Sequence, residues 1–335
     1  MTGSPVVPFA FFLLAAVPGL SAAQVPVDRE VHLMGTTARL EIHSRDRASG
    51  LVALERMIGV LEVAEQELST WKEGSALSRL NRHPQGSEFP VEAALCALFR
   101  ELAFWHNQTG GAFDPAVGRL IESWGLNGTP RRPGAEELTT ARLQSGFEHL
   151  EITERSSGCV LTRVREVILN SGGFAKGAGL DRLLHDTRDR RETDPWMVDL
   201  GGQVMVSSPP SGGRAWAVAL AHPRERHRPV RTLWLTSGSL ATSGGSESDL
   251  GVGGTRVGHV LDPQSGETVV SDGAVVVWHE SALVADILST ALYVMGPEQG
   301  LKWSERQGIA ASFLIPHRDV VDSVSSSRFQ DQFPD

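Results

Sequence analysis

The fold depends most on the stretch Leu169-Asn170-Ser171-Gly172-Gly173-Phe174-Ala175-Lys176-Gly177-Ala178-Gly179-Leu180-Asp181. It follows an apolar, partly β-branched segment and precedes a helix-like segment at residues 180–185, so it predicts a strand–turn–helix connection. Its four glycines remove Cβ atoms where a chain turns tightly or a ligand approaches the backbone. The turn would present free N–H groups and the positive end of a helix, which suit a phosphate, and Lys176 adds a mobile cation.

Two well-known phosphate-binding motifs are excluded at this turn. The glycine spacing differs from the dinucleotide fingerprint, and no Gly-Lys-Ser/Thr follows, as a Walker A loop requires. A plain connection with a solvent-facing Lys176 therefore remains open from these residues alone.

Composition indicates a globular protein and argues against some partners. The chain has 335 residues, of which 41% are apolar and 21% charged, so it can bury a large core as one domain or two lobes. It contains 31 Lys and Arg against 40 Asp and Glu, a net charge of −9, with no basic stripe. An acidic chain of this kind is not expected to bind nucleic acid as its main task.

Residues 1–23 predict a signal peptide for export, and residues 24–335 the exported, periplasmic protein. The apolar run contains two prolines and ends in Ser21-Ala22-Ala23, a small-residue cleavage pattern, and it is short for a membrane span. The leader lacks Lys and Arg, so an uncleaved amino-terminal anchor is the alternative. No lipobox cysteine stands at the cleavage point, so a lipid anchor is not expected.

Cysteine usage excludes a disulfide framework and a cysteine zinc site. Cys96 and Cys159 are the only cysteines, and they lack metal-ligand spacing. Cys96 lies in an apolar helical pattern and is expected in the core. A single bridge between the two is open in an oxidising compartment.

Hydrophobic periodicity and turn residues predict an irregular mixture of helices and strands, which favours an α+β fold over a regular βαβ series. We expect helices at residues 48–68, 75–81, 91–107 and 282–295, the third closed by Thr109-Gly110-Gly111 and the last by Gly296-Pro297. Strands are expected at residues 31–42 (as a pair or one long strand), 159–163, 166–169, 196–200, 203–207, 215–220, 233–236, 257–261, 274–278 and 309–315. Loops are expected at residues 127–134, 222–229 and 240–258, with a polar tail from Asp322.

The expected helix from residue 282 carries oxygen ligands on one face. Asp286 and Thr290 are four residues apart and Ser289 lies beside them. A carboxylate with hydroxyls suits Mg²⁺, which keeps few protein ligands and leaves positions for phosphate oxygens and water. The alternative is that Asp286 favours the helix dipole and the hydroxyls are polar fillers.

Three further segments carry candidate chemistry. His259 is the strongest general-base candidate among 11 histidines because imidazole titrates near neutrality, although most histidines are structural or solvated. Ser243 is disfavoured as a nucleophile because no Gly-x-Ser-x-Gly elbow surrounds it. Trp71 and Phe113 each adjoin polar groups and could stack on a planar heterocycle, with core packing as the alternative.

Taken together, eight segments in order resemble the successive motifs of the ApbE family. They are Met34-Gly35-Thr36, Leu68-Ser69-Thr70-Trp71 with residues 75–81, Thr109-Gly110-Gly111-Ala112-Phe113-Asp114-Pro115, Gly173-Phe174-Ala175-Lys176-Gly177 with Asp181, Asp199-Leu200-Gly201-Gly202, Ala241-Thr242-Ser243-Gly244, His259-Val260-Leu261-Asp262-Pro263-Gln264-Ser265-Gly266, and Ala285-Asp286-Ile287-Leu288-Ser289-Thr290-Ala291. Members of that family are exported FAD:protein FMN transferases. The resemblance implies a single ApbE-like, T-fold-related α+β domain of two lobes, with the flavin and metal site between them.

The resemblance also implies roles for individual residues. His259 would be catalytic. The FAD-binding positions would be Met34, Trp71, Ala112, Phe113, Asp114, Asn170, Lys176 and Val260, and the Mg²⁺ ligands the Gly173 carbonyl, Asp286, Thr290 and the nearby Ser289. The chain departs from the family pattern where Asn170 and Gln203 replace aspartates, where Trp71 replaces the usual tyrosine, and in lacking an aromatic residue after Gly244.

The implied activity is the Mg²⁺-dependent transfer of FMN from FAD to a Thr or Ser hydroxyl of an acceptor protein, with release of AMP. FAD and the acceptor are the expected partners, and the membrane is involved only through export or the acceptor. A Mg²⁺-dependent FAD pyrophosphatase and a non-catalytic flavin-binding module are the alternatives.

Overall fold

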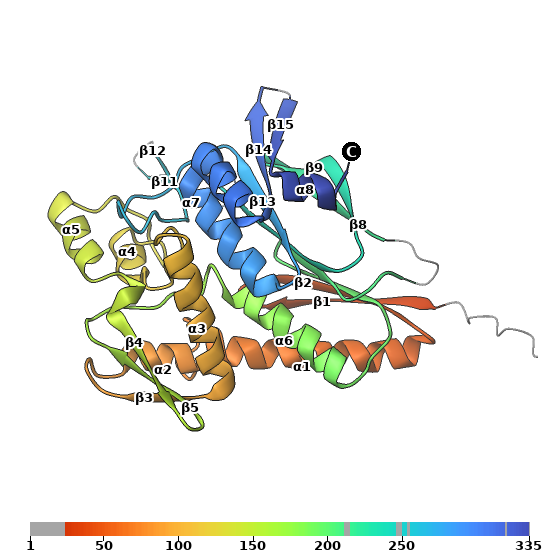
Figure 1. Ribbon diagram of the computed structural model, residues 1–335, viewed down its shortest axis with the longest axis horizontal. Coiled ribbons are helices and arrows are strands. Elements are labelled where there is room, and N and C mark those ends of the chain that lie inside the picture. Colours follow the sequence, from red (N-terminus) through yellow and green to blue (C-terminus); the bar gives the residue numbers. More distant parts are fainter. Residues whose placement is uncertain (1–23, 211–214, 246–249, 253–254, 319, 335) are drawn as a thin grey trace, which may run out of the picture.

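An eight-stranded antiparallel sheet forms the centre of the protein, in the order β1-β2-β6-β7-β10-β13-β14-β15 (Figure 1). The computed structural model describes residues 24–210, 215–245, 250–252, 255–318 and 320–334. The strands are β1 (Val25–Leu33), β2 (Thr36–Ser44), β6 (Trp196–Leu200), β7 (Gln203–Val206), β10 (Gly238–Gly244), β13 (Ala274–His279), β14 (Ala310–His317) and β15 (Val320–Ser325). The proposed signal peptide, residues 1–23, lies outside the described residues.

Three long helices pack together beside this sheet (Figure 1). They are α1 (Arg47–Leu68), α6 (Ala175–Asp189) and α7 (Ala282–Gln307). Apolar residues of α1 and α6 share one core with β1, β2 and β6, because the helical spacing predicted for α1 places Leu54, Leu61 and Leu68 on one buried face. The α7 helix packs on β10, β13 and β14 and bends at Gly296, where the backbone leaves the helical region before the helix resumes.

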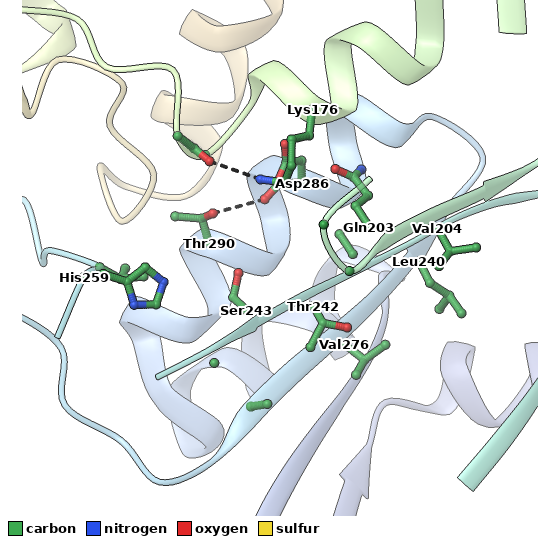
Figure 2. Close-up of a pocket in the computed structure, with 18 of the residues that line it drawn as sticks. Lys176, Gln203, Val204, Leu240, Thr242, Ser243, His259, Val276, Asp286 and Thr290 are labelled. Carbon is green, nitrogen blue, oxygen red and sulfur yellow. Dashed lines mark hydrogen bonds and ion pairs between the residues drawn. The ribbon is translucent and has the colours of Figure 1, made fainter. Parts of the chain in front are cut away.

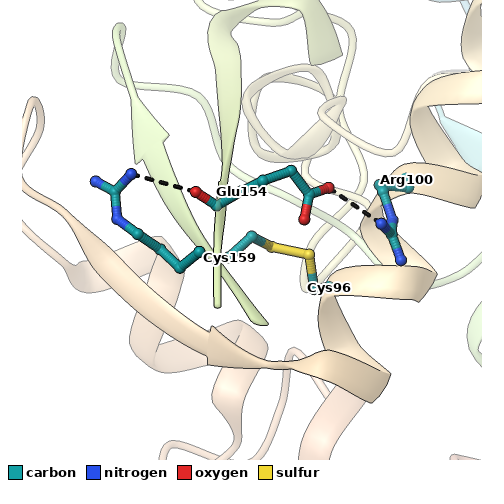
Figure 3. The surroundings of a disulfide bond; sticks show 5 residues. Cys96, Arg100, Glu154 and Cys159 are labelled. Carbon is teal, nitrogen blue, oxygen red and sulfur yellow. Dashed lines mark hydrogen bonds and ion pairs between the residues drawn. A yellow bond between two sulfur atoms is a disulfide. The ribbon is translucent and has the colours of Figure 1, made fainter. Parts of the chain in front are cut away.

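A smaller unit of the fold lies on the other side of α7, around a three-stranded sheet in the order β3-β5-β4. Its elements are α2 (Ala76–Arg82), β3 (Phe89–Glu92), α3 (Ala93–Gln108), α4 (Gly118–Ser123), α5 (Ala135–Leu143), η1 (Phe147–His149), β4 (Leu150–Arg155) and β5 (Gly158–Arg163). A disulfide joins Cys96 on α3 to Cys159 on β5 with a Cα–Cα distance of 5.6 Å, and Arg100 pairs with Glu154 beside it (Figure 3). The bridge that the sequence left open is therefore formed.

The face of the large sheet away from α7 is covered by a hairpin of β8 (Trp216–His222) and β9 (Glu225–Leu235) and by α8 (Ser327–Gln332). The short strands β11 (Leu250–Val252) and β12 (Thr255–Val257) pair with each other. No helix among the described residues combines the length and the apolar character needed to cross a membrane.

Several predicted elements were wrong in type or extent. Residues 166–169 form no strand. The Asn81 side chain donates to the Leu169 carbonyl and accepts from its N–H, both at 2.8 Å, and the Ile168 carbonyl accepts from Gly118 N–H, in place of a partner strand. The predicted loop at residues 222–229 belongs mostly to β9. The register between β8 and β9 shifts next to Leu220, at a bulge.

The remaining corrections concern boundaries and the carboxyl-terminal region. Residues 240–258 contain the end of β10 together with β11 and β12 rather than one loop, and residues 257–261 are mostly outside strands. Residues 91–92 belong to β3, not to the helix that follows. The expected polar tail from Asp322 completes β15 and then forms α8, whose N-cap is Ser326.

Candidate functional site

A cavity of about 890 Å³ opens between the two parts of the fold. Its wall combines β10, the start of α6, the middle of α7, and the loops around residues 112–117 and 259–263. Of the residues predicted for the site, ten line this cavity: Ala112, Phe113, Asp114, Asn170, Gly173, Lys176, His259, Val260, Asp286 and Thr290. Segments far apart in sequence are thus brought to one place.

The glycine-rich turn enters this cavity and then starts α6. The Asn170 N–H donates to the Pro115 carbonyl at 2.7 Å, and its side-chain oxygen accepts from Gly172 N–H at 2.8 Å, which fixes the turn. Gly177 has a different role from the phosphate contact that the sequence suggested. A Cβ at Gly177 would lie 2.4 Å from the Ala282 carbonyl oxygen, so glycine lets α6 and α7 cross at close range.

Asp181 is the residue that ties the turn to α7. Its carboxylate accepts hydrogen bonds from the N–H groups of Ala282 at 2.6 Å and Leu283 at 3.1 Å, and from the Ser281 hydroxyl. These groups belong to the first turn of α7, where N–H groups lack partners inside the helix. Sequence reasoning missed this role because about a hundred positions separate Asp181 from the helix that it caps.

The expected oxygen ligands meet on the cavity side of α7. The Asp286 side chain is buried, its Oδ2 accepts from Gly177 N–H at 3.0 Å, and its Oδ1 lies 3.7 Å from Lys176 Nζ. Gly173 lies against Thr290, since a Cβ there would come within 3.2 Å of Thr290 Oγ1. Gly173, Asp286 and Thr290 therefore lie on the wall of one cavity, and their role as ligands of one ion stays a prediction.

The hydroxyls of Ser289 and Thr290, next to Asp286, form hydrogen bonds with the backbone of α7. Thr290 Oγ1 and Ser289 Oγ both donate to the Asp286 carbonyl, at 3.2 and 3.0 Å. Ser289 is fully buried, and its oxygen also lies 2.9 Å from Ser243 Oγ on β10. Ser289 thus joins α7 to β10 behind the cavity, while Thr290 lines it (Figure 2).

His259 is exposed and lines the same cavity, on the side of Thr290 and Ser243 (Figure 2). The next residues hold this loop in place. Asp262 accepts from Gln264 N–H at 2.9 Å and from the Ser265 hydroxyl at 2.7 Å, so its carboxylate forms the turn. His259 therefore precedes a turn held by hydrogen bonds, and it lines the same cavity as Asp286 and Thr290.

Phe113 and Asp114, which were predicted to bind FAD, are held mainly by the core. The Phe113 side chain is 2% exposed, which agrees with the core-packing alternative for its ring. The Asp114 carboxylate accepts from Ala116 N–H at 2.7 Å and from Phe147 N–H at 3.1 Å. Burial raises the pKa of Asp114, while nearby His106 acts in the opposite direction.

Met34 and Trp71 lie outside the set of described residues that line the cavity. Met34 occupies the turn between β1 and β2 with a φ of 51°, and its N–H donates to Glu65 Oε1 at 3.0 Å. Trp71 is 72% exposed, so its ring is available for stacking. The structure therefore does not bring these two residues together with the oxygen ligands.

Gln203 is a wall residue to which sequence reasoning gave no role beyond a departure from the family pattern. Its amide nitrogen donates to the Ala282 carbonyl at 2.8 Å, so it ties the start of β7 to the first residue of α7. Arg39 on β2 also lines the cavity and was missed, because nothing in the sequence separates it from ordinary strand residues. Thr36 lines the cavity too, and the sequence pointed to it only as part of the Met34-Gly35-Thr36 segment.

Comparison with known proteins agrees with this geometry. The family model described as "ApbE family" matches residues 34–313. The FAD:protein FMN transferase of Vibrio cholerae is 29% identical, over 95% of this chain and 96% of its own length. Two crystal structures superpose closely. The flavinyl transferase ApbE of Pseudomonas stutzeri has a TM-score of 0.80 at 28% identity, covering 93% of this chain and 98% of its own. The ApbE protein of Thermotoga maritima has a TM-score of 0.83 at 26% identity, with coverage of 93% and 100%.

The fold expected from the resemblance is confirmed, with a mostly antiparallel sheet and packed helices. The family match extends from the β1–β2 turn to β14 and includes the glycine-rich turn, β10 and the oxygen ligands of α7. This protein belongs to the ApbE family.

Proposed function

We propose that this protein transfers FMN from FAD to a Thr or Ser hydroxyl of an acceptor protein, in a Mg²⁺-dependent reaction that releases AMP. The observation that carries the proposal is the single cavity in which Asp286, Thr290 and Gly173 lie with Lys176 and His259. Relatives named FAD:protein FMN transferase, matched over most of their length, support FAD as the donor and a protein as the acceptor.

The residues present fit a hard divalent cation. A buried carboxylate, a hydroxyl and a main-chain carbonyl are oxygen donors of the type that Mg²⁺ prefers. The ammonium group of Lys176 lies among oxygens of this site, 3.7 Å from Asp286 Oδ1 and 3.5 Å from the Gly172 carbonyl (Figure 2). Gly173, Asp286 and Thr290, supported by Ser289, would hold the cation. When bound, it would neutralise charge on the phosphates of FAD.

The remaining residues have separate roles in this proposal. His259 accepts the proton of the acceptor hydroxyl, since it is exposed at the cavity and imidazole titrates near neutral pH. Lys176 moves from Asp286 to the pyrophosphate, where its positive charge attracts the donor. Asp181 and Gly177 hold α6 against α7 and so keep the start of α6 beside the part of α7 that carries Asp286.

Bonding changes at one phosphorus atom account for the products. The acceptor oxygen forms a bond with the phosphorus on the FMN side, and the bond from that phosphorus to the bridging oxygen breaks. AMP leaves with the bridging oxygen, and FMN remains attached to the acceptor through a phosphoester. If water takes the place of the hydroxyl, the same step gives free FMN and AMP, which is the pyrophosphatase reaction.

We also propose that the protein acts after export. The apolar leader with its small-residue end at residues 21–23 supports this location. The disulfide between Cys96 and Cys159 agrees with an oxidising compartment such as the periplasm. Fractionation of cells that express the full chain tests it: the protein should appear in the periplasmic fraction, beginning at Gln24.

The function is tested by incubating residues 24–335 with FAD, Mg²⁺ and a purified flavin-acceptor domain, followed by intact-protein mass spectrometry. We expect an FMN adduct on the acceptor with the wild type, and none with His259→Ala or with Asp286→Asn, which keeps the size of the side chain. His32→Ala is the matched control, since His32 is exposed on β1. Full labelling by both site variants would refute the assignment. AMP release without an acceptor would favour the pyrophosphatase.

A further inference from the structure

A second cavity, of about 480 Å³, lies beside the first, and Asp114 and Pro263 line both. It is bounded by the end of α3, the loop at residues 110–114 and the segment around η1. His106, Asp114 and Glu148 face one another there, and one ligand atom from each lies within 4.8 Å of the others. This cluster is separate from the oxygen ligands on α7.

The tautomer of His106 makes its second nitrogen available. Its Nδ1 lies 3.1 Å from the Phe113 carbonyl oxygen, which can only accept a hydrogen bond, whereas Asp114 Oδ2 lies 3.6 Å from Nδ1, beyond hydrogen-bond distance. Nδ1 therefore carries the proton, and Nε2 has a free lone pair. This arrangement, in which a carboxylate or carbonyl fixes one ring nitrogen, is the one found behind metal-binding histidines.

The free nitrogen faces a carboxylate. His106 Nε2 lies 3.8 Å from Glu148 Oε2. A nitrogen lone pair and a carboxylate oxygen are both electron-rich, so they do not attract each other directly. A metal ion between them would make the contact favourable, as would a second proton on the imidazole or a water molecule that donates to both. The opposite oxygen of Glu148 lies 3.7 Å from His149 Nε2, so the carboxylate is flanked by two imidazoles.

The backbone makes room for this carboxylate. Gly146 has a φ of 116°, and a Cβ built there would lie 2.5 Å from Glu148 Oε1. The Glu148 side chain is 61% exposed, so it is free to move towards His106. Asp114 is fixed, because its oxygens accept from Ala116 and Phe147 N–H, yet each oxygen keeps a second lone pair.

We propose that His106, Asp114 and Glu148 form a binding site for one divalent transition-metal ion, with Zn²⁺ as the test ion. One imidazole and two carboxylates are Zn²⁺ ligands, and the open side of the cavity supplies a position for water. Mg²⁺ is disfavoured here because it prefers oxygen ligands only. The ion would join α3, the loop that carries Asp114 and the η1 segment, and so brace the wall shared with the first cavity.

The test measures Zn²⁺ binding to residues 24–335 in the presence of saturating Mg²⁺, which occupies the site on α7 under the proposed function. Isothermal titration calorimetry and metal analysis after dialysis should show one Zn²⁺ per chain. His106→Ala and Glu148→Gln should each weaken binding at least about tenfold, the smallest loss expected when even an outer-shell partner is removed. X-ray absorption of the Zn²⁺ complex should show one imidazole among oxygen ligands.

Two control variants separate this site from others. His32→Ala removes an exposed histidine far along the chain, and Asp286→Asn alters the site on α7; both should bind Zn²⁺ as the wild type does. Loss of binding in Asp286→Asn but not in His106→Ala would overturn the proposal. So would an absence of Zn²⁺ binding by the wild type. Glu148→Gln changes an exposed side chain, so unchanged Zn²⁺ affinity in that variant also overturns it.

Discussion

Gly177→Ala tests how the close crossing of α6 and α7 builds the site. The new methyl group would lie 2.4 Å from the Ala282 carbonyl oxygen and 2.7 Å from the Leu283 Cα, both backbone atoms that cannot rotate away. Relief requires the helices to separate. Separation would also stretch the hydrogen bond from Gly177 N–H to Asp286 Oδ2, now 3.0 Å. Overpacking of this kind costs about 1–3 kcal/mol.

Gly179→Ala is a matched control on the same helix. There a Cβ would meet its nearest atoms, Met34 Sδ first, at 3.4 Å or more, which is ordinary van der Waals contact. Replacing a helical glycine without strain stabilises a protein by about 0.4–1 kcal/mol. Both variants share this gain, so they should differ in free energy of unfolding by about 1–3 kcal/mol, the cost of overpacking at Gly177.

Urea denaturation followed by circular dichroism measures this difference, and Mg²⁺ titration of the folded variants measures its effect on the site. We expect Gly177→Ala to be the less stable variant and to bind Mg²⁺ more weakly than Gly179→Ala. Equal unfolding free energies for the two variants would refute the claim that glycine is needed at 177 for helix contact.

Three further predictions concern the site, the bridge and the half-buried His279. Asn170→Asp adds a carboxylate to the cavity wall while keeping an acceptor for Gly172 N–H, so we expect tighter flavin or Mg²⁺ binding by calorimetry; unchanged affinity for both would count against a role there. Cys96→Ser with Cys159→Ser should lower the free energy of unfolding by about 2–4 kcal/mol, measured against the oxidised wild type, and reducing agent should affect only the wild type. Burial lowers the pKa of His279 below its ordinary value of 6.5, so its contribution to stability is full above pH 6.5 and is lost as the pH falls towards the folded-state pKa. His279→Asn should therefore flatten the decline in unfolding free energy between pH 6.5 and 5, and an unaltered decline would contradict this.

Local pattern was sufficient where a residue's environment comes from its near neighbours in sequence. The helix at residues 48–68 was predicted nearly to its ends because one face is continuously apolar. The Met34-Gly35 turn, the stop after Gln108 and the break at Gly296 also follow from local turn chemistry. The metal candidates Asp286 and Thr290 share a helix face for the same reason.

Long-range pairing was what the sequence could not reveal. Residues 166–169 have the composition of a strand, yet the backbone of Leu169 bonds to Asn81 on a distant helix and the Ile168 carbonyl accepts from Gly118 N–H. Asp181 caps α7 across a hundred positions, and Gly177 serves a contact between helices that meet only in the folded protein. The site positions themselves came from the family resemblance. The family match and the fold confirm that resemblance, and the roles of the individual residues stay predictions.

The most direct measurement of the central claim is the stoichiometry of products when the protein, FAD and Mg²⁺ are mixed with an acceptor domain. AMP is quantified by chromatography and the FMN adduct by intact-protein mass spectrometry. The account predicts one AMP for each FMN bound to a Thr or Ser hydroxyl, and neither product when Asp286 is changed to Asn. AMP formed together with free FMN, and an acceptor that stays unmodified, would contradict it.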